Sequence, residues 1–478
     1  EGVRNRNAWY IGDGMVYLYN NADMAQYESD YWEYQNPYRR PGTTVDTQNR
    51  DFLYIQYMDE YLSNQDFVGG VNMEGLYGTA AMHLESYHKG TPTKTANIYG
   101  VPNPEHNCSL EALKSYFMFD DEVLCLGTGI NANDGFDVLT VVENRRAKKQ
   151  EKLGDNLYIG TEKLIVDGVE RSVPVVDSAN VKAQTEEMSL SDARCAHLEN
   201  VGGYYFPQGG DLFVCRRTGA SSFLEMWLNH GVSPQNETYS YVMLPNKTPE
   251  QTGAYAQNPD IEILSNTTSV QAVREKNLDI TSMIFWEAGS FGGIKVSDPM
   301  MVMVKEEDGK RKISVSDPTQ KLDMATVTID GAMELLESDK NFSISHEGGG
   351  TILTVNFEKA SGGTLTAELE DAFTYYEGFS YDNGEFTLET GSANGWESVS
   401  YVNNQKAAGV NYLEIENGRL KVTKETEYNT TVTERIMLRL KNSALTRGTS
   451  GGKKILVEYD VEHSTAGDLM SEIGRAHV

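Results

Sequence analysis

The chain has 478 residues, of which 39% are apolar and 23% charged, a composition typical of globular domains and not of disordered chains. Its formal net charge of −29 argues against a nucleic-acid partner, because an acidic surface repels phosphate backbones. No apolar run approaches the roughly 20 residues that cross a bilayer, so no membrane partner is expected. A local basic cleft could still bind an acidic sugar polymer.

Strand and turn signals dominate the chain from its beginning. Residues 14–19 form a short aromatic and β-branched run closed by a pair of asparagines, which predicts a strand. Residues 115–130 contain two apolar runs around a pair of aspartates, which predicts a β-hairpin. Helical periodicity is confined to residues 109–113 and 249–257, which are single turns or short helices at most. Further strands are predicted at residues 138–144, 164–166, 203–207, 212–216, 238–244 and 282–286.

These signals predict an all-β fold with a large antiparallel β-sandwich, a small β-sandwich domain and a truncated β-sandwich module. The third module opens on an aromatic, glycine-rich stretch and contains Trp396, which is either a platform for a sugar ring or a core residue. The last seven residues interrupt the β-pattern and are expected to be a non-native tail. The predicted boundaries are 1–298, 299–371, 372–471 and 472–478.

Cysteine and histidine usage predicts no metal site and no cofactor. The four cysteines stand far apart, with no CxxC pair and no zinc-type spacing. Cys125 and Cys215 lie in apolar runs and are interpreted as core thiols, with a disulfide as the alternative. His230 is interpreted as a structural hydrogen-bonding residue more readily than as a base. Residues 131–135 resemble a turn and offer too few oxygen ligands for calcium.

A series of longer strings, in order over roughly the first 300 residues, resembles polysaccharide lyase family 8, the hyaluronate, chondroitin AC and xanthan lyases. The first is WYIGDGMVYLYN at residues 9–20, followed by NPYRRPGTT at residues 36–44. The likeness fades across residues 299–371 and is absent after them. The other strings lie at residues 31–32, 78–82, 114–122, 140–145, 203–207, 227–231, 239–241 and 270–273.

The resemblance implies an architecture and a reaction. In that family an α/α toroid precedes a central β-supersandwich and a small carboxy-terminal β-domain, and the chain begins where the toroid would end. The family reaction is a metal-independent β-elimination at a uronic acid, in which a Tyr shuttles the proton, an Asn and a His neutralise the substrate carboxylate, and an Arg assists. These groups lie on the toroid, so the resemblance assigns none of them to this sequence.

The loop at residues 31–42 combines aromatic rings, one acid and two arginines between proline and glycine, which is typical of a binding loop. The predicted substrate-binding residues here are Trp32, Asn36, Arg39 and Arg40. The alternatives are that the aromatics pin the loop to the sandwich and that Asn36 caps the turn. By resemblance to some family members, Glu33 is the candidate catalytic carboxylate, facing the toroid and pairing with its arginine; a solvated surface acid is the alternative.

Arg216 and Arg217 follow an apolar strand-like run and are further candidates for contact with an anionic polymer. We therefore expect a fragment of a secreted, extracellular bacterial lyase, monomeric, whose partners are an acidic polysaccharide and the missing toroid of the same polypeptide. The alternative is a non-catalytic carbohydrate-binding β-sandwich protein.

Overall fold

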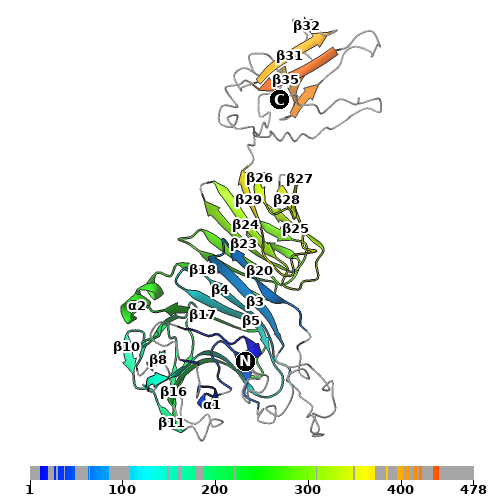
Figure 1. Ribbon diagram of the computed structural model, residues 1–478. Coiled ribbons are helices and arrows are strands. Elements are labelled where there is room, and N and C mark those ends of the chain that lie inside the picture. Colours follow the sequence, from blue (N-terminus) through cyan, green and yellow to red (C-terminus); the bar gives the residue numbers. More distant parts are fainter. Residues whose placement is uncertain are drawn as a thin grey trace, which may run out of the picture. The chain divides into compact units, whose positions relative to one another are not determined.

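The computed structural model describes residues 11–19, 26–27, 31–36, 38–48, 63, 65–85, 108–147, 150–153, 156–158, 163–177, 188–219, 222–307, 309–347 and 350–371, and six strands between residues 384 and 440. The chain divides into two units, Glu1–Glu370 and Asp371–Val478, each of which is described by itself (Figure 1). Antiparallel sheets make up nearly all of the described structure, so the predicted all-β fold is confirmed. Among the described residues, no helix is long and apolar enough to cross a membrane.

The first sandwich of unit one contains a nine-stranded antiparallel sheet. Its order is β10-β9-β13-β14-β17-β5-β4-β3-β2. The hairpin β4–β5 contains the segment predicted as a hairpin, and its strands pair in antiparallel register around the aspartate turn. The strands are β2 (Val68–Met73), β3 (Tyr77–Glu85), β4 (Glu111–Met118), β5 (Val123–Asn131), β9 (Leu164–Val166), β10 (Val169–Arg171), β13 (Cys195–Leu198), β14 (Gly202–Tyr205) and β17 (Glu237–Pro245).

A six-stranded sheet forms the other layer of this sandwich. Its order is β1-β6-β16-β15-β11, with β12 also paired to β15. A core cluster that includes Val142, Leu164, Tyr204 and Met226 contains side chains from both sheets. The strands are β1 (Thr44–Asp46), β6 (Asp137–Arg146), β11 (Val175–Asp177), β12 (Met188–Leu190), β15 (Leu212–Thr218) and β16 (Ser222–Val232).

The second sandwich of unit one begins at Ile261, whereas the sequence predicted the boundary at Asp298. β18, β19 and β20 form hydrogen bonds within the sheet that contains β23, so they belong to the second sandwich. Sequence patterning missed this because turn signals continue across the junction without a linker. A shared core cluster joins the sandwiches and contains residues of both, such as Leu124 of the first and Met301 of the second. The strands are β18 (Ile261–Asn266), β19 (Val270–Glu275), β20 (Ile280–Phe285), β21 (Gly289–Phe291), β22 (Ile294–Val296), β23 (Met300–Glu307), β24 (Lys310–Ser316), β25 (Met324–Ile329), β26 (Met333–Ser338), β27 (Phe342–Glu347), β28 (Gly350–Asn356) and β29 (Leu365–Asp371).

Helices are few and short. η1 spans Ile11–Asp13, α1 spans Tyr31–Tyr34, and α2 spans Pro249–Gln257, the segment predicted to be helical. α2 begins with a capping box, in which the Thr248 hydroxyl accepts from the Gln251 amide and the Gln251 side chain accepts from the Thr248 amide. Two other predictions were wrong. Residues 109–113, predicted as a helical turn, lead into the strand β4, and residues 14–19, predicted as a strand, form no strand.

Two short strands complete unit one, β7 (Gln150–Leu153) and β8 (Asn156–Tyr158). Unit two contains two three-stranded antiparallel sheets, β30-β33-β34 and β32-β31-β35. The side chain of Trp396 lies outside the described residues, so its predicted role is still a prediction. The strands are β30 (Gly384–Glu385), β31 (Trp396–Val402), β32 (Gln405–Ala407), β33 (Leu413–Glu416), β34 (Arg419–Val422) and β35 (Glu434–Leu440).

The central strand β5 depends on a glycine. Gly127 pairs with Tyr239 of β17, and a Cβ at Gly127 would lie 2.0 Å from the Tyr239 Cε1 atom. We expect Gly127→Ala to lower the free energy of unfolding by about 1–3 kcal/mol, because the buried Tyr239 ring would have to move. The measurement is chemical denaturation of both variants beside the wild type. The control, Gly78→Ala in β3, meets no atom closer than 3.5 Å and is expected to be neutral or slightly stabilising; equal effects in the two variants would contradict this role for Gly127.

Candidate functional site

The predicted binding loop starts at α1 and turns sharply after it. The Asn36 Oδ1 atom accepts a hydrogen bond from the Tyr38 amide at 3.0 Å, and the Asn36 carbonyl accepts from the Arg39 amide at 3.1 Å. Asn36 is buried. The structure therefore places Asn36 in the turn-capping position, the second of its two predicted roles, and does not show it open to a ligand. The side chain of Glu33 lies outside the described residues, so its role stays a prediction.

Two of the candidate arginines meet on one buried carboxylate. Glu225 of β16 has no exposed surface, and its two oxygens accept from Arg217 Nε at 2.8 Å and from Arg39 Nη1 at 3.1 Å. The guanidinium of Arg39 also lies 3.5 Å from the ring centre of Trp227, a cation–π distance. Arg39 comes from the loop and Arg217 from β15, so this Arg–Glu–Arg group ties the loop to the six-stranded sheet.

The charge on Glu225 is maintained by these neighbours. Burial alone would raise its pKa, but the charges and hydrogen bonds of Arg217 and Arg39 outweigh burial and hold the pKa below its usual value. Cys215 lies beside the same carboxylate, and burial together with the Glu225 charge raises the pKa of its thiol to about 12. Cys215 and Cys125 are both buried free thiols, as predicted.

The end of β6 carries three consecutive polar residues, which bind the loop and the chain that precedes it. Asn144 donates its Nδ2 to the Arg39 carbonyl at 2.6 Å. Arg145 donates to the Leu18 carbonyl at 2.9 Å, and Arg146 donates its Nε to the Gln26 carbonyl at 3.0 Å. Each of these three β6 side chains is buried and satisfies a backbone oxygen outside the sheet. These hydrogen bonds therefore fix the chain at Leu18, Gln26 and Arg39 relative to the sheet.

β4 holds the same region from the opposite sheet. The Lys114 Nζ atom donates to the Asp13 carbonyl at 3.0 Å and to the Gly42 carbonyl at 2.6 Å, and the Tyr116 hydroxyl donates to the Gly14 carbonyl at 2.9 Å. Burial lowers the pKa of Lys114 to about 7. Gly14 has φ +87°, and a Cβ on it would lie 2.3 Å from the Tyr116 hydroxyl, so no other residue fits this position without movement.

Trp32 belongs to an aromatic cluster around the start of the loop. Its Nε1 donates to the Tyr27 carbonyl at 2.8 Å, and its ring centre lies 5.2 Å from that of Tyr31 and 6.2 Å from that of Tyr17. The guanidinium of Arg40, which is fully buried, lies 5.2 Å from the Trp32 ring centre. Trp32 is half-buried, so the structure leaves one part of it accessible while the rest pins the loop, in line with both interpretations of this residue.

Comparison with known proteins identifies the family. The model of the polysaccharide lyase family 8 super-sandwich domain matches residues 2–256, and the model of the family's C-terminal β-sandwich domain matches residues 262–326. The chain belongs to polysaccharide lyase family 8. The second match begins within the strand that opens the second sandwich, consistent with the boundary seen in the structure.

Individual relatives include lyases for different polymers. The chain is similar to a xanthan lyase of Bacillus sp. (strain GL1), with 33% identity over 77% of the chain and 38% of the relative, and to a hyaluronate lyase of Thermasporomyces composti, with 28% identity over 76% of the chain and 44% of the relative. A solved structure of Paenibacillus xanthan lyase superposes with a TM-score of 0.64 at 28% identity, covering 85% of the chain and 38% of that protein. The chain thus spans about two fifths of the length of the relatives it matches.

The site contains several residues that the sequence did not predict. Glu225, Asn144 and Arg145 hold the loop and its neighbouring segment, yet none was a candidate. The available signal was a charged or amide residue inside an apolar strand run, such as Glu225 between Leu224 and Met226. Charges at such positions are rare unless they are paired, and a pairing partner far along the chain is invisible to strand patterning.

The remaining candidate arginine faces away from Glu225. Arg216 and Arg217 are neighbours in β15, so their side chains point to opposite faces of the sheet. Arg216 is half-buried, and its contact with a polymer is still a prediction. His230 is bonded to the Thr140 hydroxyl at 2.8 Å, and burial lowers its pKa to about 4, which agrees with a structural role.

Two groups of described residues have the geometry to hold a cation. Asp120, Asp121 and Glu122 at the β4–β5 turn place one carboxylate oxygen each within 4.8 Å of the others. Burial, with the nearby carboxylates, raises the pKa of Glu122 to about 9, while Lys247 pairs with Asp121. The second group is Asp46, Cys108 and Asp134.

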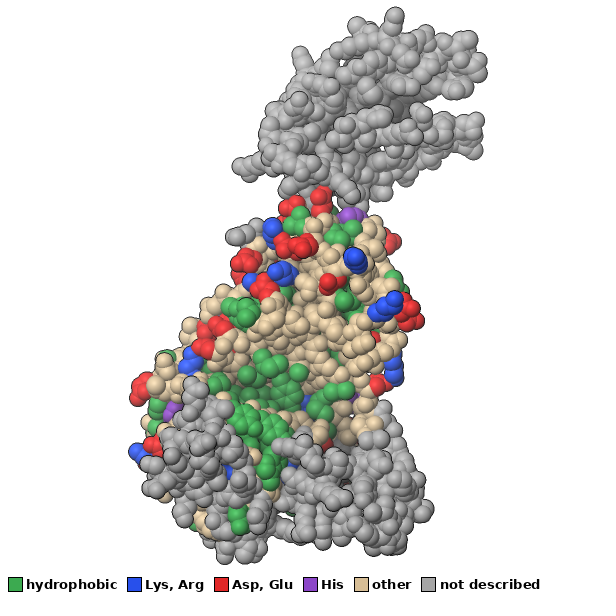
Figure 2. Space-filling view, in the orientation of Figure 1, with side chains coloured by type: hydrophobic (Ala, Val, Ile, Leu, Met, Phe, Trp, Pro, Cys, Tyr) green, Lys and Arg blue, Asp and Glu red, His purple; other side chains and the backbone are tan. Residues whose placement is uncertain are grey.

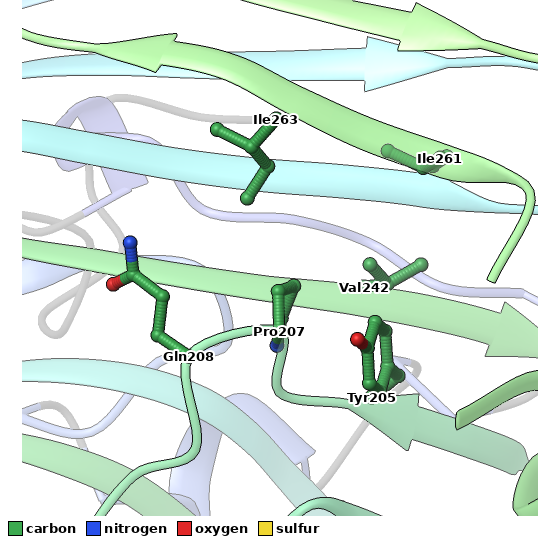
Figure 3. Close-up of a pocket in the computed structure, with 6 residues that line it drawn as sticks. All are labelled: Tyr205, Pro207, Gln208, Val242, Ile261 and Ile263. Carbon is green, nitrogen blue, oxygen red and sulfur yellow. The ribbon is translucent and has the colours of Figure 1, made fainter. Parts of the chain in front are cut away.

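A pocket of about 310 Å³ lies beside the junction of the two sandwiches (Figure 3). Val242 of β17 and two isoleucines of β18 provide apolar surface, and the Gln208 amide is the main polar group opposite them. None of the predicted site residues lines this pocket, so it is separate from the candidate loop. Its lining residues are Tyr205, Pro207, Gln208, Val242, Ile261 and Ile263.

The buried ion group yields a stability prediction. We expect Glu225→Gln to lower the free energy of unfolding at pH 7 by about 3–5 kcal/mol, because two arginines would lose their buried counterion. A carboxyl whose folded pKa is depressed stabilises above its unfolded pKa and loses that contribution as pH falls through the folded value. The difference from wild type should therefore shrink below pH 4.5.

The measurement is chemical denaturation of wild type and variant from pH 7 down to pH 3. Glu237→Gln, a change at an exposed position in β17, is the matched control and is expected to have little effect. A Glu225→Gln difference that is small at pH 7, or that is constant across the pH range, would contradict the ion group as described.

Proposed function

We propose that the chain is the β-part of a secreted bacterial lyase that cuts an acidic polysaccharide by metal-independent β-elimination at a uronic acid. An α/α toroid in the same polypeptide carries the catalytic residues in this proposal. Support comes from the family membership, from relatives that are named as xanthan and hyaluronate lyases, and from the chain matching about two fifths of their length. The β-part supplies a wall of the substrate cleft.

The chemistry explains why a β-part alone is not sufficient. Removing the proton next to a uronate carboxylate builds charge on a group that is already anionic, so donors must neutralise the carboxylate and a base must reach the proton. A tyrosine that takes this proton needs a pKa lowered toward neutrality. Among the described tyrosines with a shifted pKa, burial moves every one upward; these are Tyr31, Tyr116, Tyr204, Tyr239, Tyr241 and Tyr255.

The family match over most of the chain is the observation that carries the proposal. Two described histidines have a shifted pKa, the buried His197 and the half-buried His230, and desolvation lowers the pKa of both. These tyrosines and histidines suit structural roles, and the proposal places proton transfer on the toroid. The β-part then contributes Glu33 next to the catalytic arginine, the accessible part of Trp32, and Arg216 as a polymer contact.

Turnover measurements on the full polypeptide, with the upstream coding region included, test this proposal. We expect eliminative cleavage of hyaluronan, chondroitin or xanthan, seen as absorbance of the unsaturated product, with a kcat that a chelator does not change. Glu33→Gln is expected to lower kcat about tenfold or more with little change in KM, because a carboxylate that orients an arginine acts mainly in the transition state.

The control is Glu237→Gln in the same polypeptide, which is expected to keep both constants at wild-type values. The 478-residue chain alone is expected to show no turnover on any of the three polymers. Cleavage by the isolated chain would overturn the assignment of catalysis to the toroid. Binding without cleavage by the full polypeptide would favour the non-catalytic carbohydrate-binding alternative.

A further inference from the structure

The segment before the loop carries a pair of parallel tyrosine rings that the sequence did not single out. Tyr17 and Tyr19 lie with their ring planes 7° apart and their ring centres 6.5 Å apart. The spacing matches the about 6.6 Å that two residues of extended chain span, which places both side chains on the same side of the segment. Tyr19 is 49% exposed and Tyr17 is half-buried.

A third tyrosine supports the pair. The ring of the buried Tyr27 meets Tyr17 edge-on at 5.1 Å and Tyr19 edge-on at 5.0 Å between ring centres. The Tyr27 hydroxyl accepts from the Leu18 amide at 3.1 Å, and Arg145 donates to the Leu18 carbonyl at 2.9 Å. The residue between the two rings is therefore held at both of its backbone polar groups, so the pair is fixed in place before any ligand arrives.

Arginine side chains lie against the other rings of the aromatic cluster. Among the described residues, each other ring of the aromatic cluster has a guanidinium within 6 Å of its centre. The distances are 5.9 Å for Arg145 on Tyr27, 5.8 Å for Arg146 on Tyr31, 5.2 Å for Arg40 on Trp32 and 4.9 Å for Arg217 on Phe223. Arg217 donates to Glu225, and Arg145 lies 3.7 Å from a Glu143 oxygen, so carboxylates and rings together hold these arginines behind the pair.

From this arrangement we infer that Tyr17 and Tyr19 form a platform for successive sugar rings of an acidic polysaccharide. The exposed aromatic faces receive the C–H faces of the sugars, since the negative face of an aromatic ring attracts polarised hydrogens. Figure 2 shows hydrophobic side chains gathered on the visible face of the lower part of unit one.

This inference rests on the proposed function for the class of polymer, but it concerns binding and needs no turnover. Binding of hyaluronan, chondroitin and xanthan oligosaccharides to the 478-residue chain is measured by calorimetry at low salt, beside neutral dextran. We expect Tyr19→Ala to weaken binding of one acidic oligosaccharide about tenfold, the equivalent of 1.4 kcal/mol, through loss of the stacked ring. Tyr19→Phe, which keeps the ring, is expected to bind like the wild type.

Leu76→Ala is the matched control, because Leu76 is a 73% exposed apolar residue in the β2–β3 turn, and it is expected to leave binding unchanged. Thermal unfolding of each variant shows whether the fold is kept. Wild-type affinity in Tyr19→Ala would overturn the platform, as would equal binding of dextran or no acidic oligosaccharide bound by the wild type. Turnover by the full polypeptide is read separately, so loss of the platform and loss of the proposed lyase activity are distinguishable.

Discussion

A fully buried carboxylate is stable only when cationic side chains pair with it. In this protein, the pairing of one such carboxylate holds the candidate loop against the sheet. Glu225 lies in β16 and is neutralised by Arg217 from the neighbouring strand and by Arg39 from the loop. One of these cations comes from the sheet and the other from the loop, so the loop is needed to compensate the charge of Glu225. If the loop moved away, Glu225 would lose one of its two paired arginines, and the free energy of unfolding would fall by several kcal/mol.

Buried polar side chains of β6 and β4 also hold the loop and the chain before it. Asn144, Arg145 and Lys114 are buried polar residues whose hydrogen bonds end on backbone oxygens of the segment and the loop. These hydrogen bonds form only when those chain segments are docked. The aromatic cluster covers this polar layer, so the rings proposed to bind sugar stand on a rigid support. In a lyase of this family, such preorganisation would spare the enzyme the entropy cost of ordering the wall of its cleft at each binding event.

Sequence patterning predicted the parts of the fold that depend on local signals. The hairpin around Asp120 and Asp121 and the capped helix after Thr248 are encoded by turn and capping residues within a few positions of each other. The boundary between the sandwiches was misplaced because it depends on which strands pair, and pairing is decided by contacts distant in sequence. Residues 14–19 have strand composition but form no strand, since their polar groups bond to Pro41, Tyr27 and side chains of β4 and β6 instead.

For the site, the sequence singled out the loop at residues 31–42, whose binding role is still a prediction. It named Arg39 and Arg217 as anion binders, and they do bind a carboxylate, but that carboxylate is Glu225 of the same chain. No local sequence pattern distinguishes an arginine that pairs with a carboxylate of the same chain from one that binds a substrate. The most direct test is therefore a double-mutant cycle of Arg39→Met and Glu225→Gln, with free energies of unfolding measured at pH 7. A coupling energy of about 2 kcal/mol or more is predicted for this buried pair, whereas additivity within about 0.5 kcal/mol would contradict the account.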